Sequence, residues 1–349
     1  MITVKNSNKL GLYQQILDDA LANYKLGQLK SNETTPDQDS QKINQLISYE
    51  LFSLIDKRLS VREKLLLNRI NQERSQALNT ARQGDIAKAE QLMEKVRSNW
   101  DINQVSSEVN LLYQSFQAAA EAYLDYRRGD SAQAWLHMTE AIIIDAVLET
   151  EYGYKVLFAH RLHLVQNLVR SEARGQRFKS AIELGSQLLS YLQGKPISLP
   201  FPVTWDTNLL SNLPPEVISL TFSLIVNEIA LIFAGRNRQE GQELWQIIVN
   251  HINLKFDHDL EMYPSAYGWL RMKQALFNSH LSIAIEMISQ FLAAGRGKTP
   301  ILWYCTAIDL IGICEELHSP NAHLLKQEIV NDAALRQDFP KQLLPLLNN

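Results

Sequence analysis

A glycine followed five residues later by a small residue recurs along this chain and limits its fold more than any other sequence feature. Gly84 precedes Ala89 in the stretch ALNTARQGDIAKAEQLMEKV, and Gly129 precedes Ala134 in AAAEAYLDYRRGDSAQAWLHMTEA. Glycine readily adopts the left-handed conformation that ends a helix. The small alanine then allows the next helix to pack closely against the previous one. Each stretch therefore predicts two antiparallel helices joined by a short turn.

The same pattern continues in weaker form toward the C-terminus. Asp85 and Asp130 directly follow the two glycines, and the helix dipole favours an acidic residue at a helix start. In NLVRSEARGQRFKSAIELGSQLLSYL, Ala181 takes the place of the small residue if the turn is shifted by one residue. The looser units are 228–252 with Gly241, 270–292 with Ala284, and a degenerate pair over 303–330. We therefore expect an all-α chain.

This punctuation resembles that of the tetratricopeptide-repeat superfamily. Gly84/Ala89 and Gly129/Ala134 match its spacing, and Ala141 matches a further small-residue position. The family repeat is about 34 residues long, whereas the units here are spaced more widely, which predicts longer helices or connections. The resemblance implies an α-solenoid of stacked antiparallel helix pairs with a concave surface. The layout, with a helical N-terminal segment before the repeats, also resembles Rap-type peptide-sensing regulators.

The composition agrees with this fold class and disfavours several functions. Gly (14) and Pro (11) are scarce in 349 residues, and helix formers dominate. A formal net charge of −4 with mixed signs indicates neither nucleic-acid binding nor binding to an anionic membrane. The first residues lack the apolar core of a signal peptide, and the stretch Leu220–Ala234 reads as a buried helix. Cys305 and Cys314 imply no disulfide framework. We expect a cytoplasmic protein.

Two interruptions divide the helical pattern. The polar stretch near 31–40 predicts a linker within an N-terminal helical segment over 1–70. The second interruption, 194–216, contains five of the eleven prolines and cannot be helical throughout. Helix pairs are expected over 71–193, and further pairs with a C-terminal cap over 217–349.

The proline-rich excursion over 194–216 has two interpretations. It is either a spacer between two halves of a solenoid or a flap over the groove that exposes Phe201 and Trp205. A long connection of this kind is uncommon without a role, but a functional role is not the rule. We favour the spacer.

A search for catalytic chemistry finds no motif. His160 and His163 lie one helical turn apart, and Glu315 to His318 forms a single Glu-x-x-His, whereas a di-iron bundle needs two. There is no His-Glu-x-x-His, glycine-rich phosphate loop or Gly-x-Ser-x-Gly elbow. We therefore expect no catalytic residue, metal or cofactor. The alternative is an all-helical enzyme or metal-dependent protein with scattered His and Glu site residues.

The resemblance also nominates residues for a groove, because the first helix of each unit lines the concave surface of such stacks. The candidates are Asn71, Arg74, Ser75 and Arg82 in the first unit; Phe116, Tyr123, Tyr126 and Arg127 in the second; His163, Gln166, Asn167, Arg170 and Arg174 in the third; and Asn227 in the fourth. The third set forms one polar helix stripe. A solvated outer face would give the same pattern.

The chemistry of this stripe favours a binding role. It is cationic on a chain of net negative charge. Asparagine amides can hold an extended peptide backbone, and arginines can bind carboxylates in a bidentate manner. We therefore expect a non-catalytic scaffold or adaptor that binds an acidic protein or peptide segment in its groove. A regulatory protein that senses such a segment is a second form of this hypothesis.

Overall fold

The computed structural model describes residues 2–30, 38–254, 263–278, 280–297 and 299–347, without the side chains of 2–12, 38–44 and 46. Within these ranges the chain forms helices and no strand, so the all-α prediction is confirmed. Two compact units are present. The middle unit is Asp39–Thr221, and the terminal unit combines Met1–Gln38 with Phe222–Asn349. The predicted linker near 31–40 lies largely outside the described residues.

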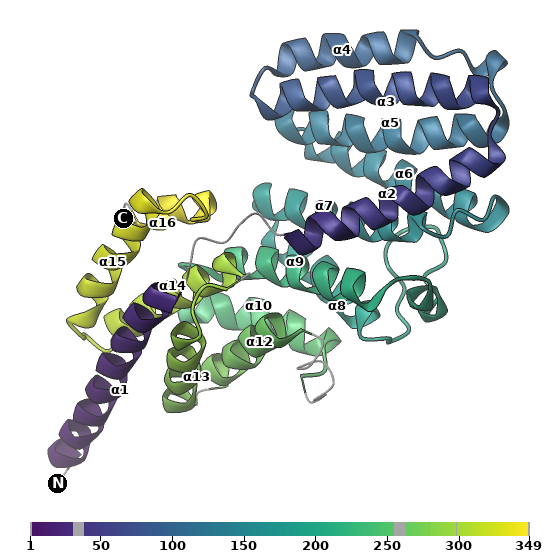
Figure 1. The fold of residues 1–349 in the computed structure, drawn as a ribbon. Helices are drawn as coiled ribbons and strands as arrows, with labels where there is room; N and C mark the ends of the chain where they lie inside the picture. Colours follow the sequence, from purple (N-terminus) through teal and green to yellow (C-terminus); the bar gives the residue numbers. More distant parts are fainter. Residues whose placement is uncertain (1, 31–37, 255–262, 279, 298, 348–349) are drawn as a thin grey trace. The chain divides into compact units, whose positions relative to one another are not determined.

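In the middle unit, consecutive helices from α3 (Val61–Arg82) onward contact their neighbours. Its helices are α2 (Gln38–Arg58), α3 (Val61–Arg82), α4 (Ile86–Ser98), α5 (Ser107–Arg128), α6 (Ser131–Glu151), α7 (Leu157–Arg174) and α8 (Phe178–Leu192), with 3-10 turns η1 (Ile102–Gln104) and η2 (Thr207–Asn212). Helix α3 packs on α4 and α5, and then α5 packs on α6, α6 on α7, and α7 on α8. Figure 1 shows α3, α4 and α5 running side by side.

The predicted turns have the geometry that their residues favour. Gly84 and Gly129 have φ of 99° and 83°, and each is followed by an aspartate that caps the next helix. The alanines Ala89 and Ala134 are completely buried. In the third turn the left-handed residue is Gln176 rather than the preceding glycine, with φ of 59°. The one-residue shift expected before Ala181 is therefore observed.

The excursion over 194–216 packs onto the middle unit. Phe201 and Trp205 are only 6% and 7% exposed. The Trp205 ring lies 5.7 Å from that of Tyr191, and the guanidinium of Arg161 lies 4.4 Å from its centroid. The interpretation as a flap exposing these two aromatic residues is therefore wrong, because both rings are held in the core by stacking and burial.

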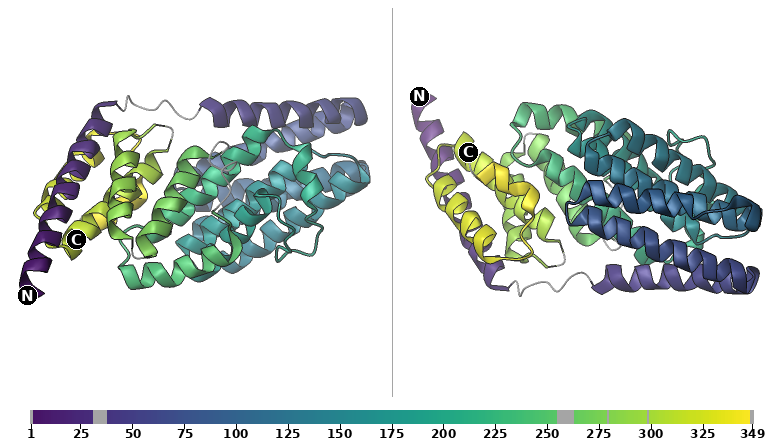
Figure 2. Two further views of the ribbon diagram at one scale, coloured as in Figure 1. Left: turned by 90° about the horizontal axis from the view of Figure 1, so that it is seen from below. Right: turned by 90° about the horizontal axis from the view of Figure 1, so that it is seen from above.

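The terminal unit joins the two ends of the chain. Its helices are α1 (Ile2–Lys30), α9 (Pro215–Phe233, which begins in the middle unit), α10 (Arg238–His251), α12 (Pro264–Phe277), α13 (Leu281–Ala293), α14 (Pro300–Glu316), α15 (Asn321–Leu335) and α16 (Leu344–Leu347), with a 3-10 turn η3 (Lys341–Leu343). Helix α1 packs against α13 and α15, as both views in Figure 2 show. The segment expected over 1–70 is thus divided, because α1 belongs to the terminal unit and α2 to the middle unit.

Specific contacts hold α1 in place. The Tyr24 ring stacks on Trp303 with centroids 4.7 Å apart, and its buried hydroxyl donates to Asp332 at 3.1 Å. Gly27 lies so close to α13 that a Cβ there would be 2.0 Å from the carbonyl oxygen of Leu292. A residue without a side chain is therefore needed for this helix crossing.

Helix α9 is the only described helix long and apolar enough to cross a membrane. Within the terminal unit, Phe222 stacks on Tyr263 with centroids 4.1 Å apart, and Phe233 contacts Trp245 and Trp269. These contacts agree with the expected buried helix.

The close crossing at Gly27 predicts a specific effect of a single methyl group. Gly27→Ala should lower the free energy of unfolding by about 1–3 kcal/mol, because the Cβ must displace the backbone of α13. Urea denaturation of the full chain measures this change. The matched control is Gly268→Ala in α12, where a Cβ meets no atom within 4 Å. It should leave stability unchanged or raise it by up to about 1 kcal/mol. Equal stability of the two variants would contradict the assigned crossing.

Candidate functional site

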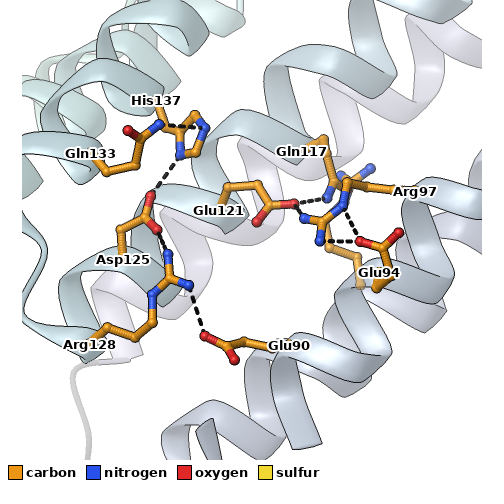
Figure 3. Close-up of polar contacts among 10 residues, drawn as sticks. Glu90, Glu94, Arg97, Gln117, Glu121, Asp125, Arg128, Gln133 and His137 are labelled. Atoms are coloured by element: carbon orange, nitrogen blue, oxygen red, sulfur yellow. Dashed lines mark hydrogen bonds and ion pairs between the residues drawn. The ribbon is translucent and has the colours of Figure 1, made fainter. Parts of the chain in front are cut away.

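Helix α5 presents two different polar surfaces on different sides. One, the carboxylate network, consists of Glu90, Glu94, Arg97, Gln117, Glu121, Asp125, Arg128, Gln133 and His137 (Figure 3). The other, the Tyr–Arg face, consists of Arg82, Tyr123, Tyr126, Arg127, Asn167 and Arg170. Side chains three, four or seven positions apart share a helix side, which explains the separation of the two sets on α5.

Asp125 is the centre of the carboxylate network. Its side chain is only 2% exposed and accepts hydrogen bonds from Arg128 and from Nδ1 of His137, the latter at 2.7 Å. Arg128 also reaches Oε1 of Glu90 at 2.9 Å. These contacts connect α4, α5 and α6 (Figure 3). A buried carboxylate is tolerated when it is paired in this way.

The second half of the network is equally well paired. Arg97 contacts both Glu94 and Glu121, and Glu121 also accepts a hydrogen bond from Nε2 of Gln117 at 2.7 Å. A groove of about 570 Å³ runs along these side chains. Because both arginines of the network bind carboxylates of the same chain, we interpret it as a structural link between helices.

The arginines of the Tyr–Arg face differ in their partners. The guanidinium carbons of Arg82 and Arg127 lie 5.8 and 5.9 Å from the ring centroid of Tyr123. Arg127 donates to the Tyr123 hydroxyl at 3.0 Å, and Arg82 donates to Oδ1 of Asn79 at 2.7 Å. Among the described residues, neither arginine forms an ion pair with a carboxylate. Each is held by neutral groups and keeps its charge uncompensated.

A small pocket opens in this face. It has a volume of about 80 Å³ and is lined by Ala119, Tyr123, Tyr126, Met138, Leu164, Asn167 and Arg170, from α5, α6 and α7. The alanine, methionine and leucine supply apolar atoms, whereas the other residues bring polar groups. Nη1 of Arg170 donates to Oδ1 of Asn167 at 3.3 Å. The pocket therefore combines an apolar lining with hydrogen-bonding groups, but its volume of about 80 Å³ is far below that of small-molecule sites and suits one small side chain.

Several predicted groove residues meet here. The structure brings together Tyr123, Tyr126, Arg127, Asn167 and Arg170, with Arg82 beside them. His163 and Arg174 are exposed on α7 but do not line the pocket. Asn227 lies in the terminal unit, and its buried Oδ1 has no hydrogen-bond partner among the described residues.

Two predicted residues are buried instead. Arg74 is 5% exposed, and its guanidinium donates to Gln117 and Asn71 at 3.3 Å each. Gln166 is 2% exposed. The helical register placed both on a polar stripe, but it carries no information about which neighbouring helix covers that stripe. Neither side chain lies open on the Tyr–Arg face.

A buried Asp–His pair was not predicted. Nδ1 of His160 lies 2.7 Å from Oδ2 of Asp145, which is completely buried, and Ser115 donates to the same carboxylate at 2.5 Å. The three residues are far apart in sequence, so no spacing signalled them. Because the serine hydroxyl bonds to the carboxylate and not to the imidazole, this arrangement is not a Ser–His–Asp relay.

His163, one turn further along α7, is neutral at pH 7. Desolvation by the surrounding protein lowers the pKa of its imidazole to about 4, and the nearby side chains of His160 and Arg170 act in the same direction. The residue keeps exposed surface, where water restores part of the lost hydration. The direction of the shift still leaves the ring uncharged, so it adds no cation to the Tyr–Arg face.

The described part of the chain contains no group of three or more His, Cys, Asp or Glu side chains placed to hold a metal ion. Comparison with protein-family models, curated proteins and solved structures finds no match. The site is therefore interpreted from its own geometry.

The structural interpretation of the carboxylate network gives a stability prediction. Asp125→Ala should lower the free energy of unfolding by about 1–3 kcal/mol, because it removes the buried acceptor shared by Arg128 and His137. Urea denaturation monitored by circular dichroism measures the loss. Glu94→Ala, at a side chain 67% exposed, is the control and should change stability by less than about 0.5 kcal/mol. If Asp125→Ala left the free energy of unfolding unchanged, a structural role for the network would be refuted.

Proposed function

We propose that the middle unit is a non-catalytic binding module whose Tyr–Arg face holds an acidic peptide segment. One observation supports this most strongly: Arg82 and Arg127 share one tyrosine ring and have no carboxylate partner among the described residues. The contrast with Arg97 and Arg128 of the carboxylate network, which are both paired, is marked. On a chain of net charge −4, two neighbouring arginines without an ion pair among the described residues favour an anionic partner.

The details of the face suit a peptide. A guanidinium that lies over an aromatic ring is partly ordered and still presents N–H groups to a carboxylate. The Asn167 amide at the pocket can bond to a peptide backbone, and the apolar lining of the pocket offers room for a small side chain. A protein that binds a peptide on this face can act as a scaffold, an adaptor or a regulator.

We further propose that the helices of the middle unit form a solenoid-like stack of the tetratricopeptide-repeat type. The left-handed turn residues Gly84, Gly129 and Gln176, each followed five residues later by a completely buried alanine, support this. The contact of α3 with both α4 and α5 agrees with nested pairs. In such a stack the first helices line a concave surface.

Charge reversal tests the binding proposal. The double variant Arg82→Glu, Arg127→Glu should bind a fluorescein-labelled peptide of ten alternating Asp and Glu residues at least tenfold more weakly than wild type. This corresponds to about 1.4 kcal/mol or more, because two attractive charges become repulsive. Fluorescence anisotropy at about 0.05 M and 0.2 M salt measures the affinity, and binding should weaken at the higher salt.

The control keeps the same net charge but changes other surfaces. Lys57→Glu with Lys155→Glu alters exposed lysines that have no ion pair among the described residues. Their neighbours Arg58 and Tyr154 both contact Glu108, at the opposite end of α5 from the Tyr–Arg face. This variant should bind within about threefold of wild type, because the altered charges lie away from the proposed site and are screened. Absence of binding by the wild type, or an equal loss in both double variants, would refute the proposal.

A further inference from the structure

The terminal unit contains a second pocket, independent of the Tyr–Arg face. It has a volume of about 480 Å³, within the range of small-molecule sites. Residues from α12 and α14 and from the turn between α9 and α10 line it, and α16 near the C-terminus adds Leu346 and Leu347. All of these lining residues belong to the same compact unit.

A buried ion pair lies at this pocket. Nζ of Lys273 is 2.7 Å from Oδ1 of Asp309, and the two side chains are only 2% and 8% exposed. The lysine nitrogen also lies 5.3–5.7 Å from the ring centroids of Phe233, Trp269 and Phe277. The ammonium is therefore held between one carboxylate oxygen and three aromatic faces.

The second carboxylate oxygen has no such arrangement. Oδ2 of Asp309 is buried and has no hydrogen-bond partner among the described residues. Buried polar atoms nearly always have a partner, so an orphaned acceptor needs an explanation. Because Asp309 lines the pocket, a molecule that enters it can supply the missing donor.

The rest of the lining is mixed. Phe277, Ile308, Ile311 and Leu346 supply apolar surface, and charged side chains share the lining, namely Arg236, Arg238, Glu315, Glu316 and Lys326. Gly312 also lines it, and a Cβ added there would meet no atom within 4 Å. The absence of a side chain at this mid-helix position leaves the volume open, although a glycine there weakens a helix.

We propose that this pocket is a binding site for a small neutral molecule with an apolar body and one hydroxyl group. The hydroxyl donates its hydrogen to Oδ2 of Asp309, and the apolar body packs among Phe277, Ile308 and Leu346. A hydroxyl fits better than an ammonium, because Lys273 already neutralises the carboxylate. A second buried cation would lose its hydration without gaining a full counter-charge.

Filling the pocket tests this proposal. Gly312→Leu places a side chain in the open volume, and Gly312→Met is a second filling variant with a more flexible side chain. Gly268→Leu is the matched control, since it also replaces a helical glycine facing open space, but one that does not line the pocket. The melting temperature (Tm) of each unliganded variant shows that it is folded.

The probes are 2-phenylethanol, 3-phenylpropanol and cyclohexylmethanol, compared with ethylbenzene and 2-phenylethylamine. At about ten times its Kd, at least one alcohol should raise the Tm of wild type and Gly268→Leu by about 2 °C or more. Both Gly312 variants should lose this rise, and ethylbenzene and the amine should produce a smaller one or none. Three results would each overturn the proposal. They are that no alcohol raises the Tm of the wild type, that the Gly312 variants respond like the control, and that ethylbenzene or 2-phenylethylamine raises the Tm as much as 2-phenylethanol does.

Discussion

The middle unit depends on the close approach of each second helix to the first, at a completely buried alanine that follows a left-handed turn residue. Ala89, Ala134 and Ala181 occupy these positions. A buried alanine allows two helices to pack more closely than a larger side chain would. The contacts of α5 with α6 and of α6 with α7 bring Tyr123, Met138 and Asn167 to one pocket.

Charge distribution on α5 gives this scaffold two distinct surfaces. On one side, Asp125 and Glu121 neutralise arginines and tie helices together. On the other, Arg127 contacts a tyrosine and no carboxylate among the described residues. The same residue type therefore forms ion pairs on one side of α5 and contacts an aromatic ring on the other. The difference follows from the partners that the fold supplies and not from the arginines themselves.

Local features of this fold were readable from the sequence, whereas long-range features were not. The turns at Gly84 and Gly129 followed from residue chemistry, and the register of the first helices placed Tyr123 and Asn167 on faces that meet. The register failed for Arg74, which a neighbouring helix covers. The packing of α1 against α13 and α15 also had no local signal, because it joins residues from opposite ends of the chain. Helical periodicity identifies a buried side, but not the element that buries it.

Photo-crosslinking reports directly where an acidic segment binds on this protein. A peptide of alternating Asp and Glu residues with a central benzophenone group would be irradiated with the full-length protein and the labelled residues identified by mass spectrometry. We predict that labels concentrate on α5, α6 and α7 around Tyr123, Met138 and Asn167, and that an excess of unlabelled acidic peptide prevents them. Labels concentrated elsewhere, for example on α4 and α8, or spread evenly over the surface, would rule out binding at the Tyr–Arg face.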